Sequence, residues 1–148
     1  MVIIMTYFLT LWMGGQYLPL DEIADTLKLS PTYSYKKGDV WIDRLGQSVT
    51  YGEDCWMIEK KHIEAEDIED EILGFISLFE NNAEYIKNLA EKFKVYLWLS
   101  AYPESDQYNI HLSHKVIKAI CNLGITMDID ITDLRVFYDG TYLSKSAD

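Results

Sequence analysis

The chain has 148 residues, 49% of them hydrophobic, which suffices for one domain with a conventional core and excludes a disordered chain. Its 24 acidic and 13 basic residues give a formal net charge of -11, which argues against a nucleic acid or an anionic membrane as partner, because phosphate groups bind basic surfaces. Two cysteines occur, Cys55 and Cys121, without a CxxC pair or zinc-type spacing, so we expect two buried free thiols in a cytoplasmic protein.

The first predicted element is a buried strand at residues 6–13 (TYFLTLWM), which mixes β-branched and aromatic residues and stops at Gly14-Gly15. The apolar N-terminus lacks the positive region and cleavage site of a signal peptide and is too short to span a membrane. A helix is predicted within residues 18–29 (LPLDEIADTLKL), with acidic residues in its first turn and Pro31 after its end.

The segment PTYSYKKGD (residues 31–39) is unusual because it places two lysines in an acidic chain. One hypothesis is an anion site, in which backbone N–H groups and both lysine side chains face a phosphate or carboxylate. The segment lacks the glycine density, the final hydroxyl and the following helix of a P-loop. The other interpretation is an architectural strand and turn. Under the first hypothesis the ligand-binding residues are Tyr33, Tyr35, Lys36, Lys37 and Gly38.

The next stretch, residues 40–54, is polar and predicts a loose hairpin. It leads into a strand at residues 55–63 (CWMIEKKHI), with Trp56 and Ile58 on one face and Cys55 on the other. From about Asp67 to Lys92, apolar residues recur every 3.6 residues, which predicts one long helix.

That helix begins with EAEDIEDE (residues 64–71), which has six carboxylates in eight residues. Negative charge is favourable at a helix N-terminus, so one interpretation is a solvated capping turn. The other is an acidic patch that captures a basic protein.

Two further strands are predicted at residues 95–102 and 108–112, separated by a turn. Ser113 is expected to begin a helix that stops at Gly124. The strand at residues 126–131 (TMDIDI) alternates, which places Asp128 and Asp130 together on one face.

Strands and helices are interspersed in this order, and strands joined by turns are antiparallel neighbours. We therefore predict an α+β fold with helices covering a mostly antiparallel sheet. Because strand–helix–strand units occur around residues 7–35 and 108–131, a duplicated ferredoxin-like arrangement is one form of it. A single domain is expected over residues 1–148, with its core at about 6–131 and a C-terminal extension at 132–148.

Four separated motifs form a pattern over most of the chain: the helix exit LPLDEIADTLKLSPT, the loop KKGD, the strand CWMIE and the closing segment LGITMDIDI. This pattern resembles a bacterial family catalogued as domain of unknown function 4279, over roughly residues 6–131. The resemblance departs at Thr132, where relatives have an aromatic residue. It implies the α+β single-domain fold and supplies no catalytic residue.

Catalytic constellations are weak in this sequence. There is no GxSxG motif, and His111 and His114 would form a two-histidine–carboxylate site only if Asp128 or Asp130 joined them. We predict no cofactor, no metal and no catalytic residue, and favour a binding protein over an enzyme.

The leading hypothesis is a small acidic module that binds a basic protein stoichiometrically, such as an immunity or inhibitor protein that neutralises a toxin or effector. Small size, acidity and an aromatic content of 14% suit this class, since interfaces favour tyrosine and tryptophan. The alternative is a small-ligand sensing or accessory domain that uses residues 31–39. The candidate partner-binding residues are Glu64, Glu66, Asp67, Glu69, Asp70, Tyr102 and Tyr108.

Overall fold

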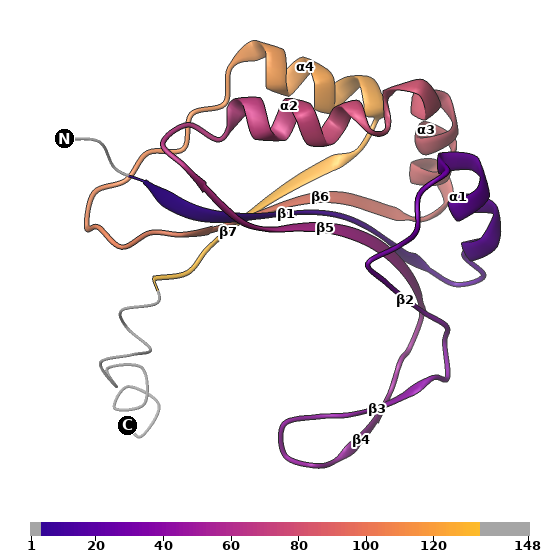
Figure 1. The fold of residues 1–148 in the computed structure, drawn as a ribbon. Helices are drawn as coiled ribbons and strands as arrows, with labels where there is room; N and C mark the ends of the chain where they lie inside the picture. Colours follow the sequence, from indigo (N-terminus) through magenta and orange to yellow (C-terminus); the bar gives the residue numbers. More distant parts are fainter. Residues whose placement is uncertain (1–3, 134–148) are drawn as a thin grey trace.

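The computed structural model describes residues 4–133, and a five-stranded sheet is its central element (Figure 1). The spatial order of the strands is β2-β5-β1-β6-β7. All neighbours are antiparallel except β6 and β7, which are parallel. The strands are β1 (Met5–Gly15), β2 (Tyr33–Tyr35), β5 (Asp54–Ala65), β6 (Lys94–Tyr102) and β7 (Thr126–Ile131).

Helices cover only one face of this sheet, as Figure 1 shows. They are α1 (Leu20–Leu27), α2 (Glu69–Ser77), α3 (Ala83–Lys92) and α4 (His114–Leu123). The core lies between the helices and the sheet, because every second residue of β1 from Met5 to Met13 is buried and the apolar stripes of the helices pack on them. None of the described helices has the length and apolarity that a membrane crossing requires.

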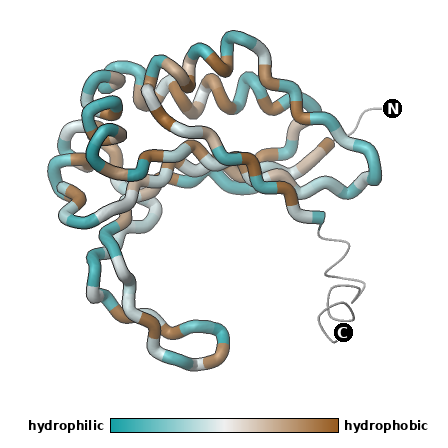
Figure 2. The backbone as a smooth tube through the Cα atoms, turned by 180° about the vertical axis from the view of Figure 1, so that it is seen from behind, coloured by the Kyte–Doolittle hydropathy of each residue, from teal (hydrophilic) through white to brown (hydrophobic). Residues whose placement is uncertain are grey.

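The opposite face of the sheet carries no helix in the described part of the chain. A separate hairpin of β3 (Val40–Ile42) and β4 (Ser48–Thr50) extends beyond the sheet on that side (Figure 1). Figure 2 shows hydrophobic residues within this hairpin. The large exposed apolar side chains there are Val40, Trp41, Ile42 and Leu45.

The predicted α+β class with a mostly antiparallel sheet is confirmed. The single helix predicted from Asp67 to Lys92 is wrong: α2 ends at Ser77, and a short 3-10 turn, η1 (Glu80–Asn82), separates it from α3. Asparagine side chains compete for backbone hydrogen bonds, which favours a break at the Asn81-Asn82 pair. The apolar stripe continues across the break because both helices pack on the same sheet face.

The strand predicted at residues 108–112 is also wrong, since the whole segment between β6 and α4 is a loop. Ile110 and Leu112 are partly buried against the core, so alternating burial in the loop produces a strand-like pattern without a paired strand. The second strand–helix–strand unit is therefore β6–α4–β7, with parallel strands. The first unit, β1–α1–β2, differs from it, because β5 lies between β1 and β2 and pairs antiparallel with both.

Candidate functional site

Three segments far apart in the sequence meet where β1 begins and where β5 and β6 end. Met5 pairs with Ala65, and Thr6 lies between Glu64 on β5 and Tyr102 on β6. The loop to α2 and the loop after β6 leave the sheet at this end of the strands (Figure 1). We call this region, formed by residues 4–7, 64–70 and 102–111, the acidic end.

Four predicted partner-binding carboxylates are exposed at the acidic end, and none of the four forms an ion pair with a described residue. They are Glu64, Glu66, Asp67 and Asp70. Glu104 lines a shallow hollow with Glu64 and Tyr102, which adds a carboxylate that sequence reasoning did not select. Lys115 borders the groove beside Asp70, but no ion pair joins them. This end therefore carries uncompensated negative charge.

Glu69 has a different role from its acidic neighbours, because the protein itself uses its carboxylate. The Ser113 backbone N–H donates to Glu69 Oε2 at 2.7 Å, and His111 Nε2 lies 3.4 Å from Glu69 Oε1. Hydrogen bonds from Ser113, with the nearby His111 and His114 as a smaller cause, lower the pKa of Glu69. Glu69 thus joins α2 to the start of α4 and is not a free partner contact.

The two predicted tyrosines lie on different parts of the acidic end. Tyr102 is half-buried at the end of β6, and its ring meets the edge of Phe8 at a centroid distance of 5.2 Å. Tyr108 is exposed in the following loop. Of the two, Tyr102 lines a hollow together with the carboxylates of Glu64 and Glu104.

An open cleft of about 480 Å³ enters the acidic end next to the buried side chain of Tyr7. Glu66, Asp67 and His111 border it, and the buried Met5 and Ile68 also line it. Burial and the Asp67 carboxylate together raise the pKa of Tyr7, so its hydroxyl stays protonated at neutral pH.

The segment 31–39 lies at the other end of the sheet, which we call the hairpin end (β2, residues 36–54 and the ends of β1 and β6 that adjoin them). Its backbone N–H groups are already occupied within the protein. Lys36 N donates to Asp39 Oδ2 at 2.9 Å, Lys37 N to Asp54 Oδ1 at 2.8 Å and Gly38 N to the Tyr51 carbonyl at 2.9 Å. An anion would therefore find only the lysine side chains, without the backbone donors that the anion hypothesis requires.

The tyrosines of this segment also serve the structure. Tyr35 stacks on Tyr51 with ring centroids 3.5 Å apart, and Trp41 stacks on the same Tyr51 at 5.9 Å. Tyr33 is exposed, with Lys61 Nζ 5.6 Å from its ring centroid. The rings thereby join β2 to the base of the hairpin.

Sequence reasoning missed a row of aromatic rings on the open sheet face. Trp12 stacks with Tyr96 at 5.7 Å and with Trp98 at 5.8 Å, and Trp98 Nε1 donates to Asp128 Oδ2 at 2.8 Å. The Trp12 ring lies so close over Gly14 that a Cβ there would be 2.3 Å from it. The signal was present, since Tyr96 and Trp98 are two positions apart on β6 and Phe8 and Trp12 are four apart on β1, so each pair shares one face of its strand.

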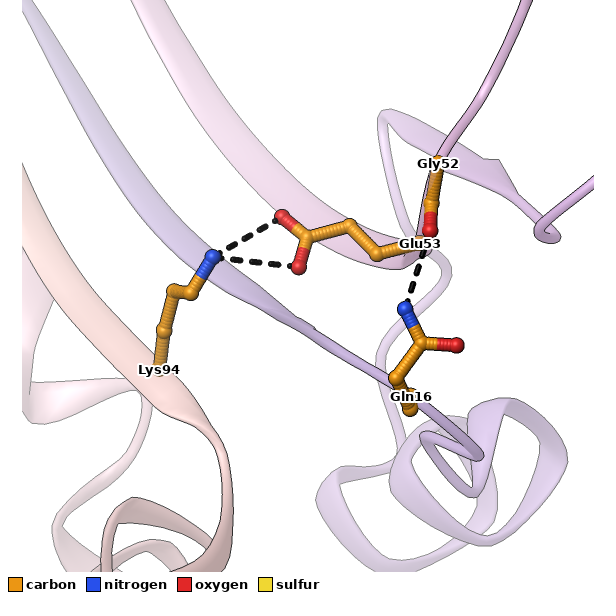
Figure 3. Close-up of polar contacts among 4 residues, drawn as sticks. All are labelled: Gln16, Gly52, Glu53 and Lys94. Carbon is orange, nitrogen blue, oxygen red and sulfur yellow. Dashed lines mark hydrogen bonds and ion pairs between the residues drawn. The ribbon is translucent and has the colours of Figure 1, made fainter.

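Figure 3 shows how an ion pair and a hydrogen bond hold the base of the hairpin against the sheet. Lys94 Nζ lies 3.1 Å from Glu53 Oε2, and Gln16 Nε2 donates to the Gly52 carbonyl at 2.9 Å. The Lys94 ammonium also lies 5.9 Å from the centroid of the Trp12 ring. The charges of Glu53 and Lys94 are thus used within the protein.

The two free cysteines differ in exposure: Cys55 is buried as predicted, whereas the predicted burial of Cys121 is wrong, since it is exposed on α4. Burial raises the pKa of the Cys55 thiol, which keeps it protonated and weakly nucleophilic at neutral pH. His111 pairs with Glu69, Asp130 belongs to the open sheet face, and no group of three His, Cys, Asp or Glu residues within 4–133 is placed to hold a metal ion.

Comparison with known proteins identifies the family of this chain. No curated protein and no solved structure matches it significantly. A family model described as "Domain of unknown function (DUF4279)" matches residues 5–134, which includes all strands and helices described above. The matched range contains the helix exit, the KKGD loop and the closing strand on which the resemblance rested. The chain therefore belongs to the DUF4279 family.

Proposed function

We propose that the protein is a small acidic binding module that captures a basic protein through its acidic end. An immunity or inhibitor protein that neutralises a basic toxin or effector is the class it fits. One observation carries the proposal. Exposed carboxylates without ion pairs come from residues 64–70, and Glu104, from the loop after β6, lies beside them.

The energetics of charge burial support a partner at this end. Like charges that gather without counterions repel one another, and a basic surface that covers them relieves the repulsion. Such complementarity accelerates association and excludes partners of the wrong sign. The exposed Tyr108 and the half-buried Tyr102 provide the aromatic contacts that interfaces favour.

The extent of the acidic end favours a protein over a small cation. Its carboxylates are distributed over a strand end, a loop and the first turn of α2, which suits several basic side chains held on one surface. Stable protein interfaces bury about 800 Å² on each partner, an area that requires contacts over several segments.

The alternative, an anion-sensing domain that uses residues 31–39, receives less support. The N–H groups of Lys36, Lys37 and Gly38 already donate to Asp39, Asp54 and Tyr51. It predicts that a Lys36→Ala/Lys37→Ala variant abolishes thermal stabilisation by phosphate or a dicarboxylate. If that variant keeps the stabilisation, or if no anion stabilises the native protein, the alternative fails.

The direct test is an affinity capture from lysate of the native host, analysed by native mass spectrometry at low and high salt. We expect one basic polypeptide at fixed stoichiometry, weakened by salt because the contact is electrostatic. The variant carries Glu64→Gln, Glu66→Gln, Asp67→Asn and Asp70→Asn. It should lose the polypeptide.

The matched control neutralises four exposed carboxylates away from the acidic end: Asp21→Asn, Asp25→Asn, Glu80→Gln and Glu91→Gln. It removes the same net charge, so it should retain the partner if position matters. Equal loss in both variants would reduce the effect to overall charge, and retention in both would overturn the proposal.

A further inference from the structure

The hairpin of β3 and β4 exposes apolar side chains to solvent, and we call its residues 40–50 the hairpin arm. The two strands form a sheet of their own, which no third strand joins in the described part of the chain. Val40 and Ile42 are 63% and 62% exposed, and Leu45 at the tip is 82% exposed. An isolated two-stranded hairpin is only marginally stable in water, and a group of exposed apolar side chains indicates a contact surface. The arm therefore calls for a partner that covers it.

A second uncovered surface runs from the open sheet face onto the same hairpin. Its members are aromatic, and we call them the aromatic strip: Trp98, Trp12, Tyr35, Tyr51 and Trp41. Neighbouring rings stack on the sheet, with centroids 5.8 Å apart, and at the hairpin, with centroids 3.5 Å and 5.9 Å apart. The two halves meet at Cys55, which pairs with Tyr35 and with Gly14, over which the Trp12 ring lies. No described helix covers this strip (Figure 1).

The aliphatic face of the arm cannot cover the aromatic strip of its own chain. Side chains alternate between the two faces of a strand, so Val40 and Ile42 lie on the face of β3 opposite to Trp41. Since Trp41 belongs to the strip, the aliphatic face points away from it. A second copy of the chain can present this face to the strip, and a two-fold axis makes the contact reciprocal. One association then covers both surfaces of both chains.

The charges on the two surfaces are complementary. Arg44, next to the tip of the arm, is exposed, and no ion pair joins it to a described residue. At the sheet end of the strip, Trp98 Nε1 donates to Asp128 Oδ2 at 2.8 Å, which places Asp128 on the open face. Asp130 lies two positions further along β7 on the same face, and both carboxylates are exposed. An arm that lies along the strip of a second copy can thus bring its one arginine to these carboxylates.

We propose that two copies of the chain form a symmetric dimer in which the hairpin arm of each copy lies on the aromatic strip of the other. Burial of the aliphatic and aromatic side chains drives the association. The contact of Arg44 with Asp128 and Asp130 fixes the direction of the arm, because opposite charges set the register of an interface. The inference goes beyond the proposed function and is independent of it, since it uses neither residues 64–70 nor Glu104.

The first test measures the mass of the full-length native chain by sedimentation velocity over a range of concentrations. We expect an equilibrium between monomer and dimer without larger species, because the reciprocal contact is closed. Leu45→Ser removes an apolar side chain from both contacts of the dimer and should raise its Kd about tenfold. The circular dichroism spectrum should stay that of the native chain, since Leu45 is exposed and outside the core.

An exchange of charges tests the direction of the arm. Arg44→Glu sets carboxylates against each other in both contacts, and Asp130→Arg sets cations against each other. Each variant alone should raise the Kd of the dimer by about tenfold or more. An equimolar mixture of the two variants should restore association as a heterodimer, since both of its contacts join opposite charges. Asp25→Arg, with the same change of charge on α1, is the matched control and should dimerise as the native chain does.

Each outcome decides the inference. A native chain that stays monomeric up to about 1 mM would overturn it and would leave the strip to a foreign ligand. A dimer that is indifferent to Leu45→Ser and to both charge reversals would overturn it too, because another surface would then hold the copies together. A mixture that stays dissociated would refute the pairing of Arg44 with the β7 carboxylates. The variant with four neutralised carboxylates at the acidic end should still dimerise, so loss of the captured polypeptide and loss of the dimer are separate observations.

Discussion

At the hairpin end of the sheet, the carboxylates of Asp39, Asp43, Glu53 and Asp54 are bound by the protein's own backbone or by a lysine, whereas at the acidic end most carboxylates face solvent without a counterion. Asp54 accepts the N–H groups of Leu18 and Lys37, and Glu53 pairs with Lys94. Glu66 and Asp70 have no ion pair with a described residue. The difference separates charges that build the fold from charges that are available to a partner.

This difference changes the significance of the two segments that stand out in the sequence. The basic run at residues 36–37 is conspicuous in an acidic chain. Its backbone N–H groups, however, already donate to the carboxylates of Asp39 and Asp54. The run at residues 64–71 resembles an ordinary helix start, yet only some of its carboxylates stabilise a helix or a loop. Whether a charged group already has a partner within the fold is a better guide to function than how unusual it looks in the sequence.

The largest effect on stability is expected for Asp54→Ala at the hairpin end. It leaves two backbone N–H groups, those of Leu18 and Lys37, without their carboxylate, and should lower the free energy of unfolding by about 3 kcal/mol. Glu66→Ala at the acidic end should change it by no more than about 0.5 kcal/mol. Urea denaturation of both variants measures the difference between their free energies of unfolding. Equal losses in the two variants would contradict the distinction between the two ends.

Gly14→Ala should have the next largest effect, because the new Cβ would meet the Trp12 ring at 2.3 Å. The ring must leave its place between Tyr96 and Trp98, at a cost of about 1–3 kcal/mol in the free energy of unfolding. Near-ultraviolet circular dichroism should lose part of its tryptophan signal. Gly52→Ala is the matched control, since nothing lies within 4 Å of a Cβ at that position. An unaltered tryptophan signal in Gly14→Ala would contradict the stacked arrangement.

Glu69 provides a pH-dependent exception within the acidic end. Its pKa in the folded state is lowered by the Ser113 hydrogen bonds, so its contribution to stability is present above the unfolded value of 4.5 and is lost as the pH falls through the folded pKa. Glu69→Gln should therefore lose more stability at neutral pH than in acid. Urea midpoints from about pH 6 down to pH 3 measure this, with Glu66→Gln as control. A parallel shift at every pH would show that Glu69 carries no such linkage.

The smallest effect is expected for Lys94→Gln. The ion pair with Glu53 is solvent-exposed, so its loss should cost between about 0.2 and 1 kcal/mol of unfolding free energy. The loss should shrink at high salt, because screening already weakens the native pair. A loss that is independent of salt would assign the role of Lys94 to its contact with the Trp12 ring.

The elements with strong local signals were predictable from the sequence. The alternation in β1, the acidic first turn of α1 and the stop of α4 at Gly124, which adopts a positive φ of 66°, all follow local rules. The break between α2 and α3 was not predictable from periodicity, because the apolar stripe keeps its phase through η1. The unpaired loop at 108–112 also imitates a strand, since burial alternates there without strand pairing.

The candidate site was predictable in composition and unpredictable in arrangement. The acidic run and Tyr102 were visible in the sequence, but only the antiparallel register of β1 with β5 and β6 brings them to one edge. The capture of Glu69 by Ser113 depends on a contact across 44 positions of the chain, which no local pattern encodes. The cleft at Tyr7 was not predicted either, because a tyrosine inside an apolar strand resembles a core residue. The extension predicted at residues 132–148 lies outside the described residues from 134 onward.

Hydrogen–deuterium exchange of the captured complex, compared with the free protein, tests the distinction between the two ends most directly. The acidic-end account predicts slower exchange in peptides covering residues 64–70 and 102–111, with unchanged exchange at residues 36–51. Protection confined to residues 36–51, with no change at the acidic end, would contradict it.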